Sequence, residues 1–134
     1  MNKFWTFCAP AAALIAEFLP WGVKMEFMNP EGPSLTELCS YFDLLPVGYG
    51  NVFPMLVSLF TCLLVLALAF YCGRGGRHSL TAGLIFSVLG AAGSILQLVF
   101  FPVTPIGILI LLFMAAQAVF LGVLLGKSHK KAAD

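Results

Sequence analysis

The chain has 134 residues, of which 60% are hydrophobic and only 10% are charged. An average soluble domain carries about 25% charged residues, so this chain has too few polar groups to cover a water-facing surface. Lipid removes that requirement, because apolar side chains can then face outward. The formal net charge of +1 provides no basic field that would attract a nucleic acid. The composition therefore predicts an integral membrane protein with the lipid bilayer, and no nucleic acid, as its surroundings.

Four apolar stretches are each long enough to cross the roughly 30 Å hydrocarbon core of a bilayer as a helix. They cover about residues 4–23, 52–72, 80–101 and 106–126. Short turns rich in Gly or Pro join the last three stretches, as is typical of helical hairpins. The first stretch also has the leading charge and apolar run of a signal peptide, but its length favours a retained span. The sequence thus predicts an all-α membrane protein, a four-helix transmembrane bundle that forms one domain over residues 1–134.

Basic residues set the predicted orientation, because Lys and Arg concentrate in cytoplasmic loops. In the four-span arrangement Lys24 falls on one side, and all the other basic residues fall on the opposite side. These are Lys3, Arg74, Arg77, Lys127, Lys130 and Lys131. We therefore predict a multi-pass plasma-membrane protein with both termini in the cytoplasm and the connection at residues 24–51 outside. The basic tail is expected to bind anionic lipid headgroups.

The outer connection is expected to be ordered. Residues 23–27 alternate apolar and polar side chains, which favours a short strand, and residues 29–33 hold a cluster of turn-forming Pro and Gly. Ser34 and Glu37 match a capping box, which predicts a short helix through about Phe42, lying on the outer ends of the bundle. A structural cap is favoured here over a ligand-binding lid. The acidic residues of the predicted outer-loop surface are Glu26, Glu31, Glu37 and Asp43.

Small residues predict how the helices pack. In lipid, helices associate by close approach rather than by the hydrophobic effect, and small side chains permit that approach. The third and fourth stretches carry such residues at helical spacing, so we expect them to form a close pair. Packing within the chain is favoured over a dimer contact. The predicted packing residues are Gly83, Ser87, Gly90, Ser94, Ala118, Gly122 and Gly126.

Glu17 is the one ionisable residue well inside a predicted span. A charge in the bilayer interior is costly, so such a residue is usually paired, protonated or functional. Gln97, Ser58 and Thr61 fall at a similar predicted depth, and a polar cluster of Glu17, Gln97 and Ser58 is expected. A structural role, either as a protonated carboxyl bonded to Gln97 or as an interfacial carboxylate near Trp21, is favoured over a proton or cation site or a contact for a polar substrate. Gln117, midway along the fourth stretch, is expected to join helices.

The residues that usually carry chemistry form no constellation in this sequence. The cysteines contain no CxxC pair, and neither histidine has acidic or cysteine neighbours, so no metal and no cofactor are expected. Cys39 is the single cysteine of the outer loop and is expected to be buried there. No nucleophile elbow, phosphate loop or zinc-protease motif is present. The sequence therefore predicts a protein that is not an enzyme.

The stretch from Cys39 to Pro54 resembles a pattern in small four-span membrane proteins of anaerobic Gram-positive bacteria. The resemblance implies a bacterial plasma membrane and no particular activity. The layout, with a long ordered first outer loop and a short second one, is also similar to that of claudin-like tetraspan proteins, by analogy of shape alone. The paired loop cysteines of claudins are absent here.

These observations lead to two hypotheses of function. The first is an interaction partner or accessory subunit that acts through its outer loop, on another membrane protein or on a second copy of the chain. The alternative is a small oligomeric transporter or channel component, with Glu17 as its ionisable site.

Overall fold

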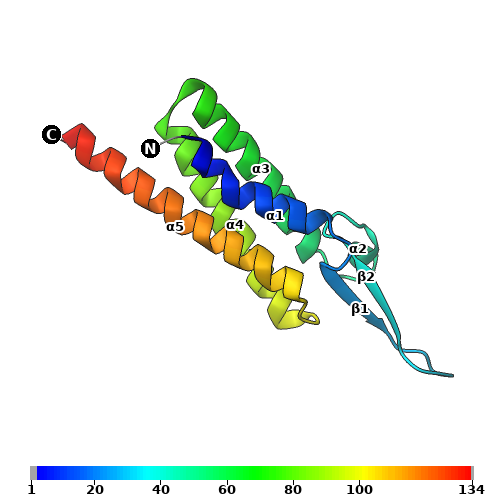
Figure 1. Cartoon of the computed structure of the whole chain (residues 1–134). Coiled ribbons are helices and arrows are strands. Elements are labelled where there is room, and N and C mark those ends of the chain that lie inside the picture. Colours follow the sequence, from blue (N-terminus) through cyan, green and yellow to red (C-terminus); the bar gives the residue numbers. More distant parts are fainter. Residues whose placement is uncertain (1–2, 134) are drawn as a thin grey trace.

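The computed structural model describes residues 3–133 of the chain, and the side chains of residues 5–128. Four helical segments run along one another, and a two-stranded hairpin projects from one end of the bundle (Figure 1). The two chain ends lie at the opposite end of the bundle, away from the hairpin (Figure 1). In chain order the elements are η1 (Lys3–Phe7), α1 (Cys8–Phe18), β1 (Val23–Phe27), β2 (Leu35–Cys39), α2 (Leu45–Gly48), α3 (Phe53–Arg74), α4 (Arg77–Phe100) and α5 (Pro105–Ala133).

Three helices are long and apolar enough to cross a membrane: α3, α4 and the part of α5 from Pro105 to Ser128. They coincide with three of the predicted spans. Large apolar side chains cover their outward faces, among them Leu66, Val99 and Val119, each more than half exposed. Such a surface is stable in lipid and unstable in water. The fold is therefore that of a mostly helical membrane protein.

The first helical segment is shorter than the predicted span of residues 4–23. It begins as the 3₁₀ helix η1, and α1 ends at Phe18. The next residue, Leu19, is extended (φ −69°, ψ 138°) because it precedes Pro20, whose ring disfavours a helical conformation at the preceding residue. By length, three helices can cross a membrane, and α1 alone is too short to do so.

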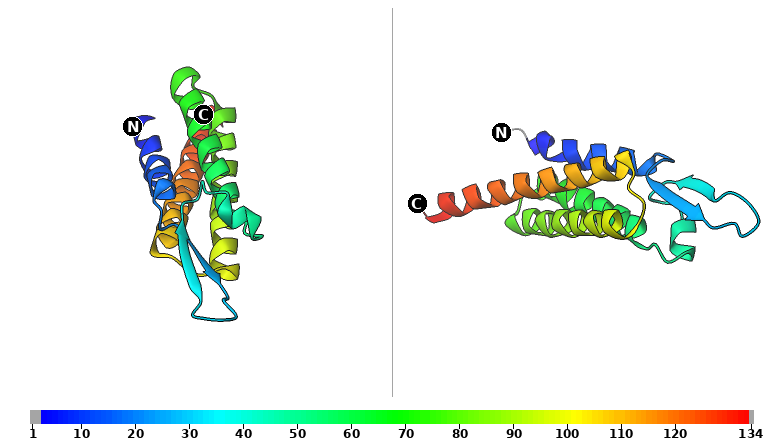
Figure 2. Two further views of the ribbon diagram at one scale, coloured as in Figure 1. Left: turned by 90° about the vertical axis from the view of Figure 1, so that its right-hand side faces the viewer. Right: turned by 90° about the horizontal axis from the view of Figure 1, so that it is seen from below.

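The connection at residues 24–51 forms a hairpin instead of the predicted strand and helix. The predicted strand at residues 23–27 is confirmed as β1, but Leu35–Cys39 is strand β2, which pairs with β1 in antiparallel register from Val23↔Cys39 to Phe27↔Leu35. The predicted helix from Ser34 is wrong because a helix this short is barely stable alone, whereas β1 offers a ready ladder of hydrogen-bonding groups. The hairpin projects beyond the bundle and does not lie across its end (Figure 2).

The helices pack around α4, which contacts both α3 and α5, while α1 lies against α5 and α3. The predicted pairing of the third and fourth spans is thus present as the contact between α4 and α5. The predicted small residues of α4, Gly83, Ser87, Gly90 and Ser94, are all buried, and Gly83 lies close to Leu121 of α5. A β-carbon added at Gly90 would overlap the terminal methyl of Met114 on α5, so a larger residue fits there only if the methionine side chain moves.

The small residues of α5 are placed differently from the prediction. Gly122 and Gly126 are exposed, and a β-carbon added at either would meet no atom of the described chain within 4 Å. Ala118 is half-buried. The intrachain packing predicted for Gly122 and Gly126 is therefore wrong, because both glycines face the outside of the bundle.

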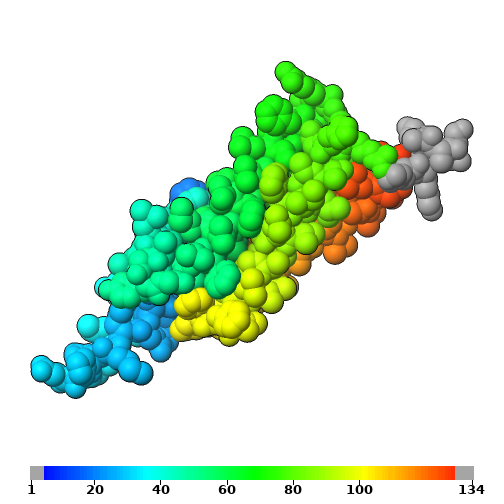
Figure 3. Space-filling view, turned by 180° about the vertical axis from the view of Figure 1, so that it is seen from behind, coloured from blue at the N-terminus to red at the C-terminus, as the bar shows by residue number. Residues whose placement is uncertain are grey.

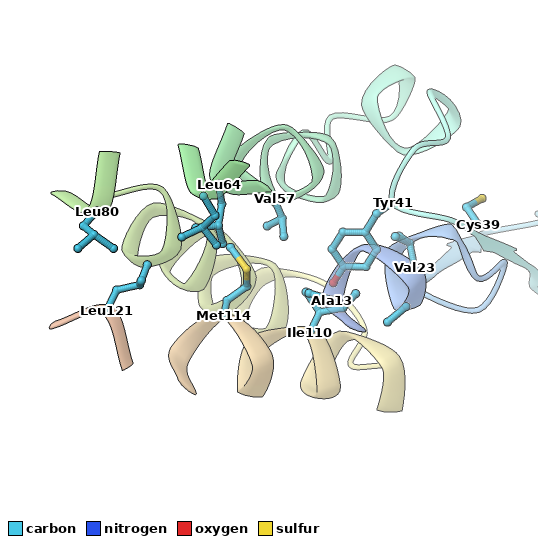
Figure 4. Packing of buried hydrophobic residues seen from close by; sticks show 12 residues of the cluster. Ala13, Val23, Cys39, Tyr41, Val57, Leu64, Leu80, Ile110, Met114 and Leu121 are labelled. Atoms are coloured by element: carbon cyan, nitrogen blue, oxygen red, sulfur yellow. The ribbon is translucent and has the colours of Figure 1, made fainter. Parts of the chain in front are cut away.

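The apolar core runs along the bundle axis and continues into the base of the hairpin. Val57 and Leu64 of α3 face Met114 and Leu121 of α5 across the interior (Figure 4). Tyr41, from the segment after β2, extends this core toward the hairpin (Figure 4). From behind, α3 and α4 form a continuous wall, and the hairpin stands clear of it (Figure 3).

Candidate functional site

A buried polar cluster lies between α1 and α3. Glu17, in the last turn of α1, has no exposed surface, and Thr61 of α3 is equally buried. Thr61 Oγ1 lies 2.6 Å from Glu17 Oε1 and 3.0 Å from the carbonyl oxygen of Val57, one helical turn earlier. The cluster therefore joins two helices at the one carboxyl group inside the bundle.

The two short contacts of Thr61 indicate the protonation state of Glu17. A threonine hydroxyl has one hydrogen to donate. Both contacts can be full hydrogen bonds if Thr61 donates to the Val57 carbonyl and accepts from a protonated Glu17. A neutral carboxyl also avoids the cost of an unpaired charge in a dry interior. The geometry thus favours the protonated carboxyl that the sequence suggested.

Two further polar side chains extend the cluster toward the hairpin. Tyr41 and Gln97 of α4 are both nearly fully buried, and the Gln97 side chain lies beside the Tyr41 phenol. Burial raises the pKa of the Tyr41 phenol, so this group stays neutral, although Gln97 acts in the opposite direction. The hydroxyl of Tyr41, Oε1 of Gln97 and Oε2 of Glu17 have no hydrogen-bond partner among the described residues. Each of these three buried oxygens can therefore accept a hydrogen bond from a water molecule or coordinate a cation.

The observed cluster differs in membership from the predicted one. Ser58 is buried, but its hydroxyl donates to the carbonyl of Met55 in its own helix, 3.0 Å away. Thr61 takes the place that was predicted for Ser58 beside Glu17, and the predicted bond between Glu17 and Gln97 is not among those formed. Positions 58 and 61 lie only about 60° apart around a helix, so both are buried on one side of α3, and the rotation of α3 brings Thr61 rather than Ser58 to Glu17.

The sequence identified the role of Gln117 but did not identify Tyr41. Gln117 was expected to join helices, and its Nε2 donates to the carbonyl of Thr6 in η1 at 3.1 Å. Tyr41 was not predicted as a site residue. The only signal in the sequence was a tyrosine within an apolar stretch of the outer loop, and such a residue is most often exposed at the membrane interface.

Replacing Thr61 with valine is expected to lower the free energy of unfolding by about 1–2 kcal/mol, because it leaves the buried Glu17 carboxyl without its partner. Valine has nearly the shape of threonine, so packing is preserved. The measurement is reversible unfolding in detergent. The matched control is Ser58→Ala, which removes a hydroxyl bonded only within its own helix and should change stability by less than about 0.5 kcal/mol. Equal losses for the two variants would contradict the role given to Thr61.

The base of the hairpin is fastened to the bundle by buried hydrogen bonds. Thr104 Oγ1 donates to the carbonyl of Gly22 at 2.6 Å and accepts from the backbone N–H of Gly107, so it also caps α5. The N–H of Tyr41 donates to the carbonyl of Glu17 at 3.0 Å. The strands thus start and end at fixed points, and the rest of the hairpin is held away from the helices.

Three residues of the predicted acidic surface lie on the hairpin, and Asp43 follows its base, between β2 and α2. Glu26, Glu31, Glu37 and Asp43 are all exposed. Glu26 forms an ion pair with Lys24 at 2.6 Å, which leaves the other three carboxylates without a basic neighbour among the described ion pairs. The basic tail cannot be compared in the same way: Lys127 is exposed, but the side chains of His129, Lys130 and Lys131 lie outside the described residues.

Cys39 is 5% exposed at the base of β2, as was expected of a buried loop cysteine. Burial raises the pKa of its thiol, and the charges of Asp43 and Glu37 raise it further. Such a thiol is a poor nucleophile at neutral pH. Among residues 3–133, no three His, Cys, Asp or Glu side chains are placed to hold a metal ion.

Comparison of the chain with protein-family models, with curated proteins and with solved structures gave no match. The resemblance of residues 39–54 to small four-span bacterial proteins, and the claudin-like layout, therefore stay predictions.

Proposed function

We propose that this chain is a non-enzymatic membrane protein that acts as an accessory subunit, binding a partner through its hairpin on the outer side of the membrane. The observation that carries this proposal is a β-ribbon with a buried, fastened base and an exposed, apolar end. Met28 is 97% exposed, and Leu35 and Leu38 are each more than half exposed. A lone two-stranded ribbon is marginally stable in water, so covering these side chains would stabilise it.

The free strand edges and the exposed charges of the hairpin indicate what kind of segment it can bind. Each strand of a two-stranded ribbon has one unpaired edge, to which an extended segment of another protein can add as a further strand. The exposed carboxylates of Glu31, Glu37 and Asp43 favour a basic segment. We therefore expect the partner to be a membrane protein whose outer domain presents an extended, basic stretch.

This function requires the hairpin to lie outside, and hence a fourth crossing by η1 and α1. Together they extend for about 26 Å, close to the thickness of the hydrocarbon core, and small differences are accommodated by the lipid. They also lie lengthwise against α5 and α3 (Figure 2). With four crossings, the basic residues place both termini in the cytoplasm.

Photocrosslinking in native membranes tests the accessory-subunit proposal. A photoreactive residue at Met28 or Leu38 should form a discrete adduct with one protein. The same residue at Leu112, an exposed position midway along α5, should capture lipid. The charge reversals Glu31→Lys and Glu37→Lys should abolish the protein adduct. Capture of lipid alone at Met28 and Leu38, or an adduct that survives the charge reversals, would contradict the proposal.

The second candidate is a small transporter or channel component that uses Glu17. It is favoured by the unpartnered Oε2 of a fully buried carboxyl, which lies near the free oxygens of Tyr41 and Gln97. Under this hypothesis Glu17→Gln abolishes proton- or cation-dependent flux in liposomes, since an amide of the same shape cannot release a proton. Unchanged flux in that variant would eliminate this candidate.

A further inference from the structure

A cavity of about 260 Å³ lies between the first strand of the hairpin and the end of the bundle. It is lined by residues 24–27 of β1, by Tyr49 and Asn51 ahead of α3, and by Phe101 and Pro102 in the turn between α4 and α5. Since α3 begins at Phe53 and α4 ends at Phe100, the cavity lies where two membrane-crossing helices end. In a bilayer this is the level of the lipid headgroups.

Asn51 is the buried residue of this cavity whose side-chain amide has no hydrogen-bond partner among the described residues. It is 1% exposed, and its backbone N–H is satisfied by the carbonyl of Pro46 at 2.9 Å. Neither the nitrogen nor the oxygen of its side-chain amide has a partner among the described residues. Buried polar groups are almost always hydrogen-bonded, because one left without a partner destabilises the fold. The lining of the cavity therefore includes an unused donor and an unused acceptor.

The charges on the cavity wall are of opposite sign. Lys24 Nζ and Glu26 Oε1 lie 2.6 Å apart, both residues belong to the cavity lining, and both side chains are partly exposed. An ion pair with this exposure contributes little to stability, so a ligand can separate it at small cost. A ligand that carries an anion and a cation a few ångströms apart would satisfy both partners. The wall is thus matched to a zwitterion.

The apolar surroundings indicate that this zwitterion belongs to a lipid. Phe101 of the cavity wall packs edge-on against Phe53, which also stacks on Phe100 with ring centroids 6.4 Å apart. Phe100 is exposed on the outside of the bundle. This aromatic surface continues from the cavity along the ends of α3 and α4, where the acyl chains of a bound lipid would lie. A soluble zwitterion would make no use of it.

We propose that the cavity binds the headgroup of a zwitterionic aminophospholipid, with Lys24 and Asn51 Nδ2 on its phosphate and Glu26 and Asn51 Oδ1 on its ammonium group. This site is independent of the partner surface at the hairpin end. The lining residues include no nucleophile paired with a base, and the arrangement therefore supports binding rather than catalysis.

Native mass spectrometry of the full chain in detergent tests this site with phosphatidylethanolamine and phosphatidylglycerol of identical acyl chains. The parent protein should retain phosphatidylethanolamine about tenfold more tightly, a difference of about 1.4 kcal/mol. Glu26→Gln should reverse the preference, because the ammonium loses its carboxylate while Lys24 becomes available to an anionic lipid. The matched control is Glu31→Gln, which makes the same charge change at a residue outside the cavity and should leave the preference unchanged. Equal binding of the two lipids by the parent protein would overturn the proposal.

A second variant distinguishes whether Asn51 binds the lipid headgroup or only an ordered water molecule. Asn51→Leu removes the two unpartnered polar atoms, so it should raise the melting temperature without lipid and abolish the stabilisation given by phosphatidylethanolamine. Lipid stabilisation that survives in this variant would show that Asn51 holds only water. Free phosphoethanolamine, which has the same headgroup without acyl chains, is then tested as a competitor of the lipid. It should compete at least tenfold less well than the lipid, and competition at equal concentration would contradict a lipid as the ligand.

Discussion

Replacing Tyr41 with alanine is expected to lower the free energy of unfolding by about 3–5 kcal/mol, the range found for large aromatic truncations in a packed interior. Tyr41 has no exposed surface, and it joins the hairpin to the bundle. A β-carbon added at Gly22 would lie 2.8 Å from its ring, and one at Gly107 would lie 3.3 Å from its hydroxyl. The ring therefore fills the space between the end of α1 and the first turn of α5. Reversible unfolding in detergent measures the loss.

The matched variant Tyr41→Phe keeps the ring and removes only the hydroxyl. That hydroxyl has no hydrogen-bond partner among the described residues, so its removal should change stability by less than about 0.5 kcal/mol. Tyr41→Ala should also make residues 28–34 more sensitive to limited proteolysis, because the hairpin loses the ring that packs its base against the bundle. Tyr41→Phe should not have this effect. Equal destabilisation by both variants would mean that the hydroxyl, and not the ring, holds the hairpin in place.

Replacing Gly90 with leucine is expected to destabilise the bundle by about 2–3 kcal/mol, as overpacking of a filled interior does. The added side chain would occupy the space of the Met114 terminal methyl, which is fully buried between α4, α3 and α5. Gly90→Ala should cost less, because the far end of a methionine can move aside. Unfolding in detergent and the fraction of monodisperse protein after purification both measure the effect.

The control for Gly90 is Gly122→Leu. A β-carbon at Gly122 meets no described atom within 4 Å, so the leucine would face the outside of the bundle and change stability by less than about 0.5 kcal/mol. Both variants make the same substitution in an apolar helix, and only the surroundings differ. Destabilisation by Gly122→Leu as large as that by Gly90→Leu would contradict the placement of the two glycines.

The long helices were predictable because their signal is strong and local. A run of about twenty apolar residues has few alternatives to a membrane helix, and α3, α4 and α5 coincide with the predicted spans. The strand at Val23–Phe27 was likewise visible as an alternation of apolar and polar residues. The end of α1 was misplaced even though Pro20 indicated it, because hydropathy continues to Val23.

The hairpin and the polar cluster depend on contacts between distant residues, which a single sequence does not reveal. The capping-box pattern at Ser34 and Glu37 describes a local preference, and pairing with β1 overrides it. Glu17 was identifiable as the one carboxyl inside a span, but its partner was not. The choice of Thr61 over Ser58 depends on how α3 is rotated against α1, which hydropathy leaves undetermined.

Membrane topology is the central claim, since the partner surface and the lipid site both require the hairpin to lie outside. The direct test is labelling of single cysteines with an impermeant maleimide in intact cells, in a variant whose four native cysteines are replaced by alanine. Met28→Cys should react in intact cells, because Met28 is the most exposed apolar residue of the hairpin. Asn2→Cys and Gly73→Cys should react only after lysis. Labelling of Gly73→Cys with protection of Met28→Cys would show that the topology is the reverse of the predicted one. Labelling of both Asn2→Cys and Met28→Cys in intact cells would show that α1 does not cross the membrane.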